Sequence, residues 1–537
     1  MSDISNSYVG PGVYVEYQDV SIPAAPNGTL FPVIIGLGQK TITYTETVTR
    51  GATTTSPLYD VLSKPSLLSV QSVASRGTVY AATTNYTVDV TNNAILWVSG
   101  SAPAAGTDYS VTYTYRKGTA DYGPFTTTRM EDIEALYGQA VFSSNLLTST
   151  VSAATTTSIS SLIPATVSAN QYAGNYLQIK SGTGVGQERL IISHAATTVT
   201  SNPVVFVVES LIATPTSGDV IAVNDISTNT LSIGAKLAIQ SGAGYVTVVQ
   251  ATDDITGSDS QGTGWEGAIY SLRNIECYAI TLMKGMTGDS NSALINYLKN
   301  HVLSMSSLLE KKFRIALIGA PVNTVIPATY SATAALLNSN RIALMCPSTM
   351  TLTLNNVSKT VDGSFLAACV AGIVCNPNYT WAEPISGKSI TPFDDIANPF
   401  IVAEQNTIGG SGVMLIEKKN PGDFRIRHAL TTDPKNPITQ ELKVTKIQDA
   451  LSKYLIASLE STFINTKNVG TDTISNVKAF LKTLLTGVMA PPRQDITGFT
   501  DPSVVPSALD PRQINVSFMI QPSWDVNWIK VTFGASI

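Results

Sequence analysis

The sequence predicts a multidomain α+β protein with β-rich blocks in its first half and an α/β region in its second. The chain has 537 residues, and a single core stops growing near roughly 250–300 residues. Charged residues number 25 among the first 250 positions and 46 among the remaining 287. The charge-poor half is rich in Thr, Ser, Val and Tyr, which favours β-structure. Beyond residue 270, apolar strands alternate with helical periods, which is typical of a parallel sheet.

The first 28 residues are predicted to be an arm, because a strand is followed there by a proline-rich extended segment. The strand consists of Val13, Tyr14, Val15, Glu16 and Tyr17. Near the other end, segments 514–520 and 527–533 also alternate with period 2, and the second includes Ile529, Val531 and Phe533. A strand on a free arm exposes unpaired backbone groups. We therefore expect these residues to pair with strands of neighbouring copies, which builds rings or helical arrays.

Two blocks between the arm and residue 225 have the pattern of short strands separated by turns. In the block 40–124, segments 86–90 and 94–98 are predicted to pair as a hairpin, because a short polar turn lies between them. The second block, about 149–225, includes the apolar strand 204–208. Between the blocks, residues 126–140 have a helical pattern, with Thr128 as a candidate cap and Glu131 three residues later.

The α/β region from about 270 is predicted from apolar strands at 276–283, 315–319 and 342–345. A helix capped by Asp289 or Ser290 follows the first strand, and further helices are predicted near 329–338 and 363–375.

The C-terminal region, 421–537, is predicted to contain two amphipathic helices. Thr445 and Gln448 have the spacing of a capping box for the first, and Gly487 is a candidate breaker for the second. Two sets of lysines share a helix face by their spacing: Lys443, Lys446 and Lys453 on one helix, and Lys478 and Lys482 on the other. These lysines form either a solvated face or a weakly basic surface for an acidic partner, since residues 421–537 hold 12 basic and 10 acidic residues.

Composition argues against several classes of protein. A net charge of −5 and a pI of about 5.4 give no basic footprint for nucleic acid. The first residues show no secretory signal, and the longest apolar run, 365–375, is too short to span a bilayer. The four cysteines form no C-x-x-C pair and are expected to be core thiols. We therefore expect neither nucleic-acid binding nor membrane insertion.

Motifs for catalysis are weak, so we expect no enzyme, no cofactor and no metal. Residues 262–267 match G-x-G-x-x-G, but a polar acidic loop precedes them instead of a strand. Segment 386–389, Ser-Gly-Lys-Ser, resembles the end of a phosphate-binding loop, but Glu383 and Pro384 occupy the position of the anion nest. The chain has three isolated histidines and no G-x-S-x-G or H-E-x-x-H motif. The adjacent carboxylates at 253–254 and 394–395 are expected to be solvated.

Several segments, in their order along the chain, resemble the contractile tail sheath proteins of myovirus-type phages. The resemblance is carried by 10–16 (GPGVYVE), 239–246 (IQSGAGYV), 314–321 (RIALIGAP), 340–344 (NRIAL), 367–372 (AACVAG), 426–433 (IRHALTTD), 444–451 (VTKIQDAL) and 516–533. Each segment alone is a weak signal, and their order is more specific. The resemblance covers residues 1–40, about 126–148 and 226–537.

The resemblance implies a fold class: multidomain α+β, with an α/β sheath core, an α+β C-terminal domain, two inserted mainly-β domains and extended terminal arms. The implied divisions are a 1–28 arm, a core of 29–39, 125–148 and 226–420, insertions 40–124 and 149–225, and a C-terminal domain 421–537.

The resemblance also implies a function. Sheath subunits stack as six-fold rings around a tail tube, linked by strands from their N- and C-terminal arms, and contract by rigid-body rearrangement without a nucleotide. The implied partners are further copies of the chain, the tail tube protein, and the baseplate and tail terminator proteins. The implied location is the virion tail, after assembly in the host cytoplasm. The five lysines named above become candidate tube contacts.

Three alternatives remain open from the sequence. The first is the sheath of a related, non-phage contractile injection system, which neighbouring genes would distinguish. The second is a static tube, capsid or surface-layer protein, which has no need for exchanged terminal arms. The third is an enzyme; loss of Lys388 without loss of function would count against it.

Overall fold

The structure is a computed structural model of the whole chain. It describes residues 30–38, 41–51, 58–64, 67–89, 92–116, 123–142, 145–163, 166–173, 175–185, 187–197, 203–211, 213–224, 229–251, 264–307, 309–420, 422–435, 439–464, 468–491 and 494–524. These residues form a mixed α/β fold, as the sequence predicts. No helix within these ranges is both long enough and apolar enough to cross a membrane.

The described residues fall into two compact units. The first contains residues up to 35, 234–247 and 272 onward, and the second contains 36–233 and 248–271.

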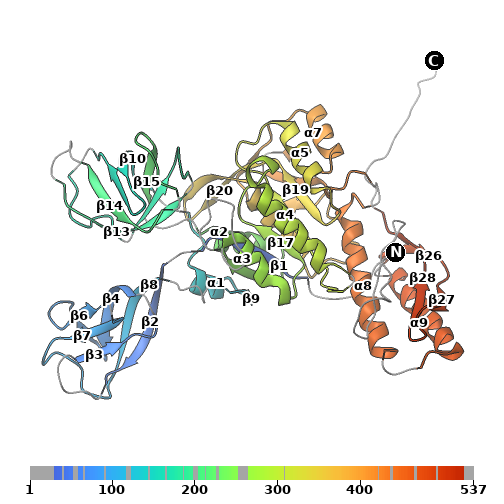
Figure 1. Cartoon of the computed structure of the whole chain (residues 1–537), viewed down its shortest axis with the longest axis horizontal. Coiled ribbons are helices and arrows are strands. Elements are labelled where there is room, and N and C mark those ends of the chain that lie inside the picture. The colour runs from blue at the N-terminus through green and yellow to red at the C-terminus, as the bar shows by residue number, and fades with distance from the viewer. Residues whose placement is uncertain are drawn as a thin grey trace. The chain divides into compact units, whose positions relative to one another are not determined.

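A nine-stranded sheet organises the α/β part of the chain (Figure 1). Its strands, in spatial order, are β22 (Ser389–Ile390), β25 (Asp423–His428), β24 (Met414–Asn420), β19 (Ile342–Cys346), β18 (Ile315–Gly319), β17 (Ala279–Leu282), β1 (Pro32–Gly36), β16 (Val246–Gln250) and β9 (Phe125–Thr127). Strands β1, β17, β18, β19 and β24 are paired in parallel. Every residue of β1, β17, β18 and β19 is buried, which is expected where helices cover both faces of a parallel sheet.

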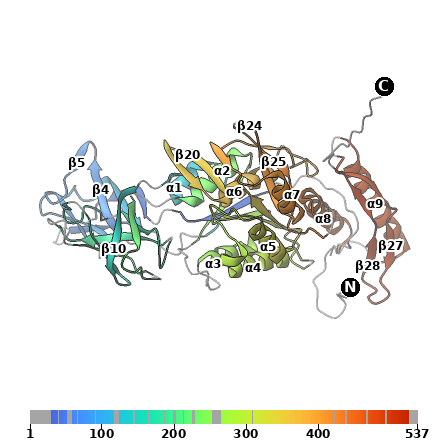
Figure 2. The ribbon, with the colours of Figure 1, turned by 90° about the horizontal axis from the view of Figure 1, so that it is seen from above.

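Helices on the two faces of this sheet bury it (Figure 2). Helices α4 (Gly288–Met305) and α5 (Pro327–Leu337) pack together on one face, and α2 (Thr230–Gln240) and α6 (Gly363–Val374) lie on the other. All residues of α6 are buried. Helix α7 (Val402–Gly410) packs beside α5. A small sheet has the order β21 (Val357–Val361), β20 (Thr349–Leu354) and β23 (Asp395–Ala397).

Two glycines allow the end of β18 to meet the start of α6. A Cβ on Gly319 would lie 1.8 Å from the carbonyl carbon of Gly363 and 2.3 Å from the nitrogen of Ser364. The backbone N–H of Gly363 donates to the carbonyl oxygen of Ala320 at 3.0 Å. The side chain of Asp362 caps α6 by accepting a hydrogen bond from the N–H of Ser364 at 2.8 Å.

Several predicted helices are confirmed, but their predicted caps are wrong. Helix α4 has Thr287 as its N-cap, so Asp289 and Ser290 lie inside its first turn. Helix α1 (Met130–Tyr137) has Arg129 as its N-cap, so Thr128 lies outside it. Neither Thr287 nor Arg129 caps its helix through a side-chain hydrogen bond.

The second unit also contains α3 (Gly264–Ser271), and the 3-10 turn η3 (Leu272–Asn274) follows it in the chain.

Residues 41–116 form two small sheets around one core. The first has the order β2 (Thr41–Thr49), β8 (Asp108–Arg116), β4 (Leu67–Ser75) and β5 (Thr78–Tyr80), and the second has β3 (Leu58–Val61), β7 (Ala94–Trp97) and β6 (Tyr86–Asp89). The predicted hairpin is confirmed, because β6 and β7 pair antiparallel. The buried carboxylate of Asp60 accepts hydrogen bonds from Arg50, Trp97 and Tyr109, at 3.2, 2.9 and 2.7 Å. Buried aromatic and aliphatic side chains from both sheets complete this core.

Residues 145–224 form a closed barrel. Its strand order is β10 (Asn145–Ala154), β11 (Ser158–Ser161), β14 (Val204–Val208), β13 (Glu188–His194), β12 (Tyr176–Ile179) and β15 (Val220–Asn224). Alternate side chains of β14 are buried, so the predicted strand 204–208 is confirmed. Aliphatic side chains and Phe206 fill the interior, and closure leaves the barrel without an open sheet edge.

The C-terminal region begins within the large sheet. Residue 421, the predicted boundary, falls between β24 and β25, which pair antiparallel. Two helices follow, α8 (Leu442–Thr462) and α9 (Thr471–Met489). Helix α9 continues two residues past Gly487, so the prediction of a breaker there is corrected. Two short antiparallel pairs complete the region: β26 (Ile496–Phe499) with β29 (Ile520–Pro522), and β27 (Ser503–Pro506) with β28 (Ile514–Ser517).

Candidate functional site: the buried start of helix α8

The first three turns of α8 are buried on all sides, from Leu442 to Ser452. The predicted capping box at Thr445 and Gln448 is wrong, because Glu441 is the N-cap and Thr445 lies inside the helix. The hydroxyl of Thr445 instead donates to the carbonyl oxygen of Asn340 at 3.0 Å. Thr445 therefore serves a tertiary contact with the core rather than a cap of its own helix.

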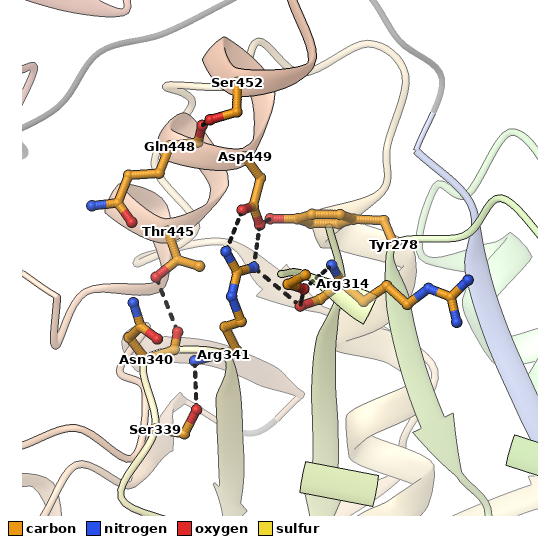
Figure 3. A network of polar contacts seen from close by, with 10 residues as sticks. Tyr278, Arg314, Ser339, Asn340, Arg341, Thr445, Gln448, Asp449 and Ser452 are labelled. Carbon is orange, nitrogen blue, oxygen red and sulfur yellow. Dashed lines mark hydrogen bonds and ion pairs between the residues drawn. The ribbon is translucent and has the colours of Figure 1, made fainter. Parts of the chain in front are cut away.

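A bidentate ion pair anchors α8 to the large sheet (Figure 3). Arg341, the residue before β19, donates from Nη1 and Nη2 to the two carboxylate oxygens of Asp449, at 2.9 and 2.8 Å. The side chains of Arg341 and Asp449 are only 8% and 1% exposed. The hydroxyl of Tyr278 donates a third hydrogen bond to Asp449 at 3.1 Å. Burial, and then the charge of Asp449, raise the pKa of Tyr278 well above its ordinary value, so Tyr278 remains a donor.

A second buried arginine, at the start of the neighbouring strand β18, extends this network. Arg314 precedes β18 and is fully buried. Its Nη2 donates to the carbonyl oxygens of Leu272 and Ile275 at 2.8 and 2.6 Å, and its Nη1 lies 2.7 Å from Nε2 of His301. Burial, and then the charge of Arg314, lower the pKa of His301 to about 3. The neutral imidazole can therefore accept the hydrogen bond from Arg314. Nη1 of Arg341 also donates to the carbonyl oxygen of Arg314 at 3.3 Å, which connects the two arginines.

Lys443 and Lys446 lie inside this junction and not on an exposed helix face. They are 5% and 2% exposed. The prediction that Lys443, Lys446 and Lys453 together form one exposed helix face is therefore wrong. Nζ of Lys446 donates to the carbonyl oxygen of Thr380 at 3.4 Å. In the first turns of α8, the side that carries Lys443 and Lys446 is therefore packed against other parts of the same chain.

The other three candidate lysines are partly exposed, and each pairs with a carboxylate of the same chain. Lys453 contacts Glu276, which ties the middle of α8 to the segment before β17. Lys478 and Lys482, on α9, lie 2.7 and 2.5 Å from the two carboxylate oxygens of Asp501.

Lys446 should make the stability of the α8 junction depend on pH. Burial lowers the pKa of its ammonium group to about 8 from 10.5. Between these two values the unfolded chain binds more protons than the folded one, so the free energy of unfolding rises with pH across this window, by about 3 kcal/mol. Below pH 8 the folded protein bears the full cost of the buried charge. Replacement of Lys446 by methionine should therefore stabilise the protein at pH 7 and remove this rise.

The measurement is denaturant unfolding of wild type and Lys446→Met from pH 7 to 10.5, with Lys482→Met as the partly exposed control. The difference between wild type and Lys446→Met should shrink as pH rises, while the control runs parallel to wild type. A constant difference between wild type and Lys446→Met would contradict the assignment.

The junction anchors α8, and the thiols and the motif lysine that the sequence singles out are buried or paired. Cys277, Cys346, Cys369 and Cys375 are buried free thiols, and burial raises their pKa values. Lys388, in the segment that resembles a phosphate-binding loop, pairs with Glu383 at 2.5 Å and lies 4.0 Å from the ring centre of Tyr379. Within the described ranges, no three His, Cys, Asp or Glu side chains group as metal ligands.

The predicted strand-pairing residues, Val13 to Tyr17 and Ile529, Val531 and Phe533, lie outside the described residues. The buried group of Tyr278, Arg314, Arg341 and Asp449 was not predicted from the sequence. A signal for it exists: Arg314 and Arg341 each stand directly before a fully apolar strand. Because neighbouring parallel strands begin at the same sheet edge, two such arginines are brought to one edge, and each buried guanidinium needs acceptors there.

Comparison with known proteins supports the resemblance. A family model described as a domain of unknown function (DUF4815) matches residues 35–147. A tail sheath protein of Mycobacterium phage Bxz1 is 25% identical over 306 residues, which are 57% of this chain and 51% of that protein. A tail sheath protein of Bacillus phage SP01 is 27% identical over 172 residues, 31% of this chain and 29% of that protein. The chain thus spans about half, or less, of the length of these relatives.

Among solved structures, the helical sheath of the anti-feeding prophage in its contracted state is similar with a TM-score of 0.44 and 12% identity. The match covers 57% of this chain and 82% of that one. The two sequence relatives confirm the predicted resemblance to phage tail sheath proteins.

Proposed function

We propose that this chain, a relative of phage tail sheath proteins, is a structural subunit of a contractile tail sheath. The observation that carries the proposal is its 25% identity over 306 residues with the tail sheath protein of Mycobacterium phage Bxz1. The relatives indicate a structural rather than an enzymatic role. In this proposal, copies of the chain stack as six-fold rings around a tail tube, and contraction moves each copy as a rigid body to drive the tube through the host envelope.

The proposal places the chain in the virion tail, assembled in the host cytoplasm. Its partners are further copies of itself, the tail tube protein, and the baseplate and tail terminator proteins.

Two features of the structure support a subunit that is held to its neighbours by exchanged strands. The pairs β26–β29 and β27–β28 are each only two strands wide among the described residues, so every strand in them is an edge strand. A strand from another copy would extend either pair by backbone hydrogen bonds. The buried ion pair of α8 then matters mechanically, because it connects this C-terminal region to the large sheet.

The test of strand exchange compares the full chain with a form that lacks residues 1–20 and with Val15→Pro. Proline removes a backbone N–H from the predicted strand, and Asp3→Pro is the matched control outside it. Negative-stain electron microscopy should show hollow tubes for the full chain and the control, with or without added tail tubes, and none for the other two forms. Tubes formed by the truncated chain would contradict strand exchange, and a full chain that stays monomeric even with tail tubes would contradict the sheath proposal.

The lysines remain candidates for contact with the tube. Lys453, Lys478 and Lys482 are the partly exposed members, whereas Lys443 and Lys446 would need α8 to leave its packed position. We propose the exposed three as the tube-facing set. If so, the double variant Lys478→Gln, Lys482→Gln should co-sediment less with tail tubes while still forming sheath polymers, and unchanged co-sedimentation would remove them from the contact.

A further inference from the structure

Strand β2 (Thr41–Thr49) is an edge strand of the four-stranded sheet β2–β8–β4–β5. Within the described part of the chain it has a neighbouring strand, β8, on one side only (Figure 1). It is nine residues long, whereas the next longest edge strand of the described sheets, β21, has five. All nine residues pair with β8 without a register shift, so no bulge bends the strand. An edge this long and regular presents a row of backbone groups with which another strand can pair.

Strand β2 also lacks the side chains that usually protect a sheet edge. It contains no proline and no lysine, and its one charged residue is Glu46. The carboxylate of Glu46 accepts hydrogen bonds from the hydroxyl of Tyr113 at 2.8 Å and from the N–H of Ser63 at 2.9 Å, so this charge is held by its own domain. Three threonines of the strand are exposed: Thr45, Thr47 and Thr49. The edge is therefore open to a further strand.

The ladder with β8 determines which backbone groups of β2 face the free edge. Arg50, directly after β2, continues this ladder, because its N–H donates to the carbonyl oxygen of Thr107 at 2.9 Å. Successive residues direct their backbone groups to opposite sides, so the even-numbered residues of β2 bond to β8. The hydroxyls of Thr45 and Thr112 lie 2.9 Å apart, as expected for opposed residues that share no backbone hydrogen bond. The odd-numbered residues therefore direct their N–H and C=O groups to the free edge.

The sequence of β2 is nearly symmetric about Thr45. Positions at equal distances from it hold the same or a similar residue in three cases: Thr43 and Thr47, Ile42 and Val48, and Thr41 and Thr49. Two copies of β2 laid antiparallel, with Thr45 opposite Thr45, bring threonine opposite threonine at every odd position. These positions carry the outward backbone groups, so each opposed pair can exchange two hydrogen bonds. Any shift from this register shortens the overlap of the two strands.

The remaining pair of positions is complementary instead of alike. In this register Tyr44 lies opposite Glu46 of the second copy. Nζ of Lys64 lies 5.3 Å from the ring centre of Tyr44, so the incoming carboxylate approaches an ammonium group. Cross-strand pairs of opposite charge stabilise a sheet, and like charges directly opposite destabilise it. The symmetric register places opposite charges near each other and no two carboxylates directly opposite.

We propose that β2 of one copy pairs antiparallel with β2 of a second copy, centred on Thr45, and joins their two sheets into one. The pairing places Thr45 on a two-fold axis, so it closes at two copies. Because a closed pair cannot build the rings of the proposed sheath, we assign this contact to copies outside a sheath. The inference goes beyond the proposed function and does not depend on it.

The test uses single cysteine substitutions in the full chain, whose four native thiols are buried. Thr45→Cys should form a disulfide-linked dimer under mild oxidation, because the Cα atoms of a hydrogen-bonded antiparallel pair are about 5.5 Å apart, within the range of a disulfide. Thr47→Cys is the matched control. Two such cysteines would be offset by about four residues, or roughly 13 Å, along the paired strands. Mixing Thr43→Cys with Thr47→Cys should restore the crosslink.

Non-reducing electrophoresis and peptide mass spectrometry measure these crosslinks. A Thr45→Cys chain that yields no dimer, or a Thr47→Cys chain that yields as much, would overturn the proposal. Tubes from a chain without the Thr45→Cys crosslink would leave the sheath proposal standing and remove this one. A crosslinked dimer from a chain that forms no tubes, even with tail tubes added, would have the opposite meaning.

A proline variant separates pairing from folding. Thr45→Pro removes an N–H that faces the free edge and keeps the backbone hydrogen bonds to β8, and edge positions of this kind tolerate proline. In sedimentation of the soluble full chain, Thr45→Pro should weaken dimerisation by roughly tenfold or more, with an unchanged thermal unfolding temperature. Thr45→Val, which keeps the N–H, should dimerise like wild type. A folded Thr45→Pro chain with undiminished dimerisation would overturn the proposal.

Discussion

Replacement of Gly319 by alanine is expected to prevent the α/β core from reaching its native packing. The added Cβ would lie 1.8 Å from the carbonyl carbon of Gly363 and 2.1 Å from its oxygen. Both atoms belong to the backbone, so relief requires β18 and α6 to separate. Since α6 is buried along its whole length, such a shift opens the core, and we expect a loss of more than about 4 kcal/mol, seen as insoluble or unfolded protein.

The matched control for Gly319→Ala is Gly487→Ala. Gly487 lies in α9, and a Cβ added there would meet no group within 4 Å beyond the adjoining turns of its own helix. Alanine at this position should stabilise the helix by about 1 kcal/mol. Soluble expression and thermal unfolding of both variants provide the measurement. If Gly319→Ala unfolds at the wild-type temperature, the close approach of β18 and α6 is wrong.

The second large effect is expected for Asp449→Ala. This change leaves the guanidinium of Arg341 buried without its carboxylate and removes the acceptor of the Tyr278 hydroxyl. Loss of one partner of a buried ion pair costs about 3–5 kcal/mol. Hydrogen exchange of peptides from 442–456 should accelerate strongly, because the opening of α8 becomes easier.

Two comparisons make the Asp449 experiment specific. The double variant Arg341→Met, Asp449→Leu replaces both charges with apolar groups and should be markedly more stable than Asp449→Ala alone. Asp501→Asn disrupts the exposed pairs with Lys478 and Lys482 and should leave exchange in α8 unchanged. Equal protection of α8 in Asp449→Ala and wild type would show that the ion pair does not hold the helix.

Much of the fold could be predicted because its strands are unusually clear in the sequence. The segment Ile315–Gly319 is a continuous apolar run ending on glycine, and it forms a buried strand with the predicted bounds. The hairpin between 86 and 98 could also be predicted, since a polar turn separates two strand-forming segments. Helix caps were less predictable: Asp289 and Thr445 have side chains suited to capping, yet Thr287 and Glu441 are the N-caps. Tertiary packing decides where a helix begins, and local spacing does not contain that information.

The candidate site was harder to predict, for a different physical reason. The spacing of Lys443 and Lys446 shows that they share one side of a helix, but it does not reveal what covers that side. Lysine is rarely buried, so exposure was the reasonable expectation. Here the carbonyl oxygen of Thr380 accepts from Lys446, and burial is tolerated with a lowered pKa. The pairing of Arg341 with Asp449 joins residues 108 positions apart, beyond the reach of any local pattern.

The position of β1 has a consequence for the order of synthesis. This strand lies inside the large sheet, and its residues 32–35 pair with 279–282 of β17. The ribosome therefore releases β1 long before either of its neighbours, β16 and β17, exists, and by then the described strands of the 41–116 sheets and of the 145–224 barrel have all been made. Domains fold as units during translation, so these two should be folded before the sheet that the chain began. Until β16 emerges, and after it β17, the apolar strand β1 lacks its neighbours in the sheet, and this interval is where a nascent chain is most exposed to aggregation and most dependent on chaperones.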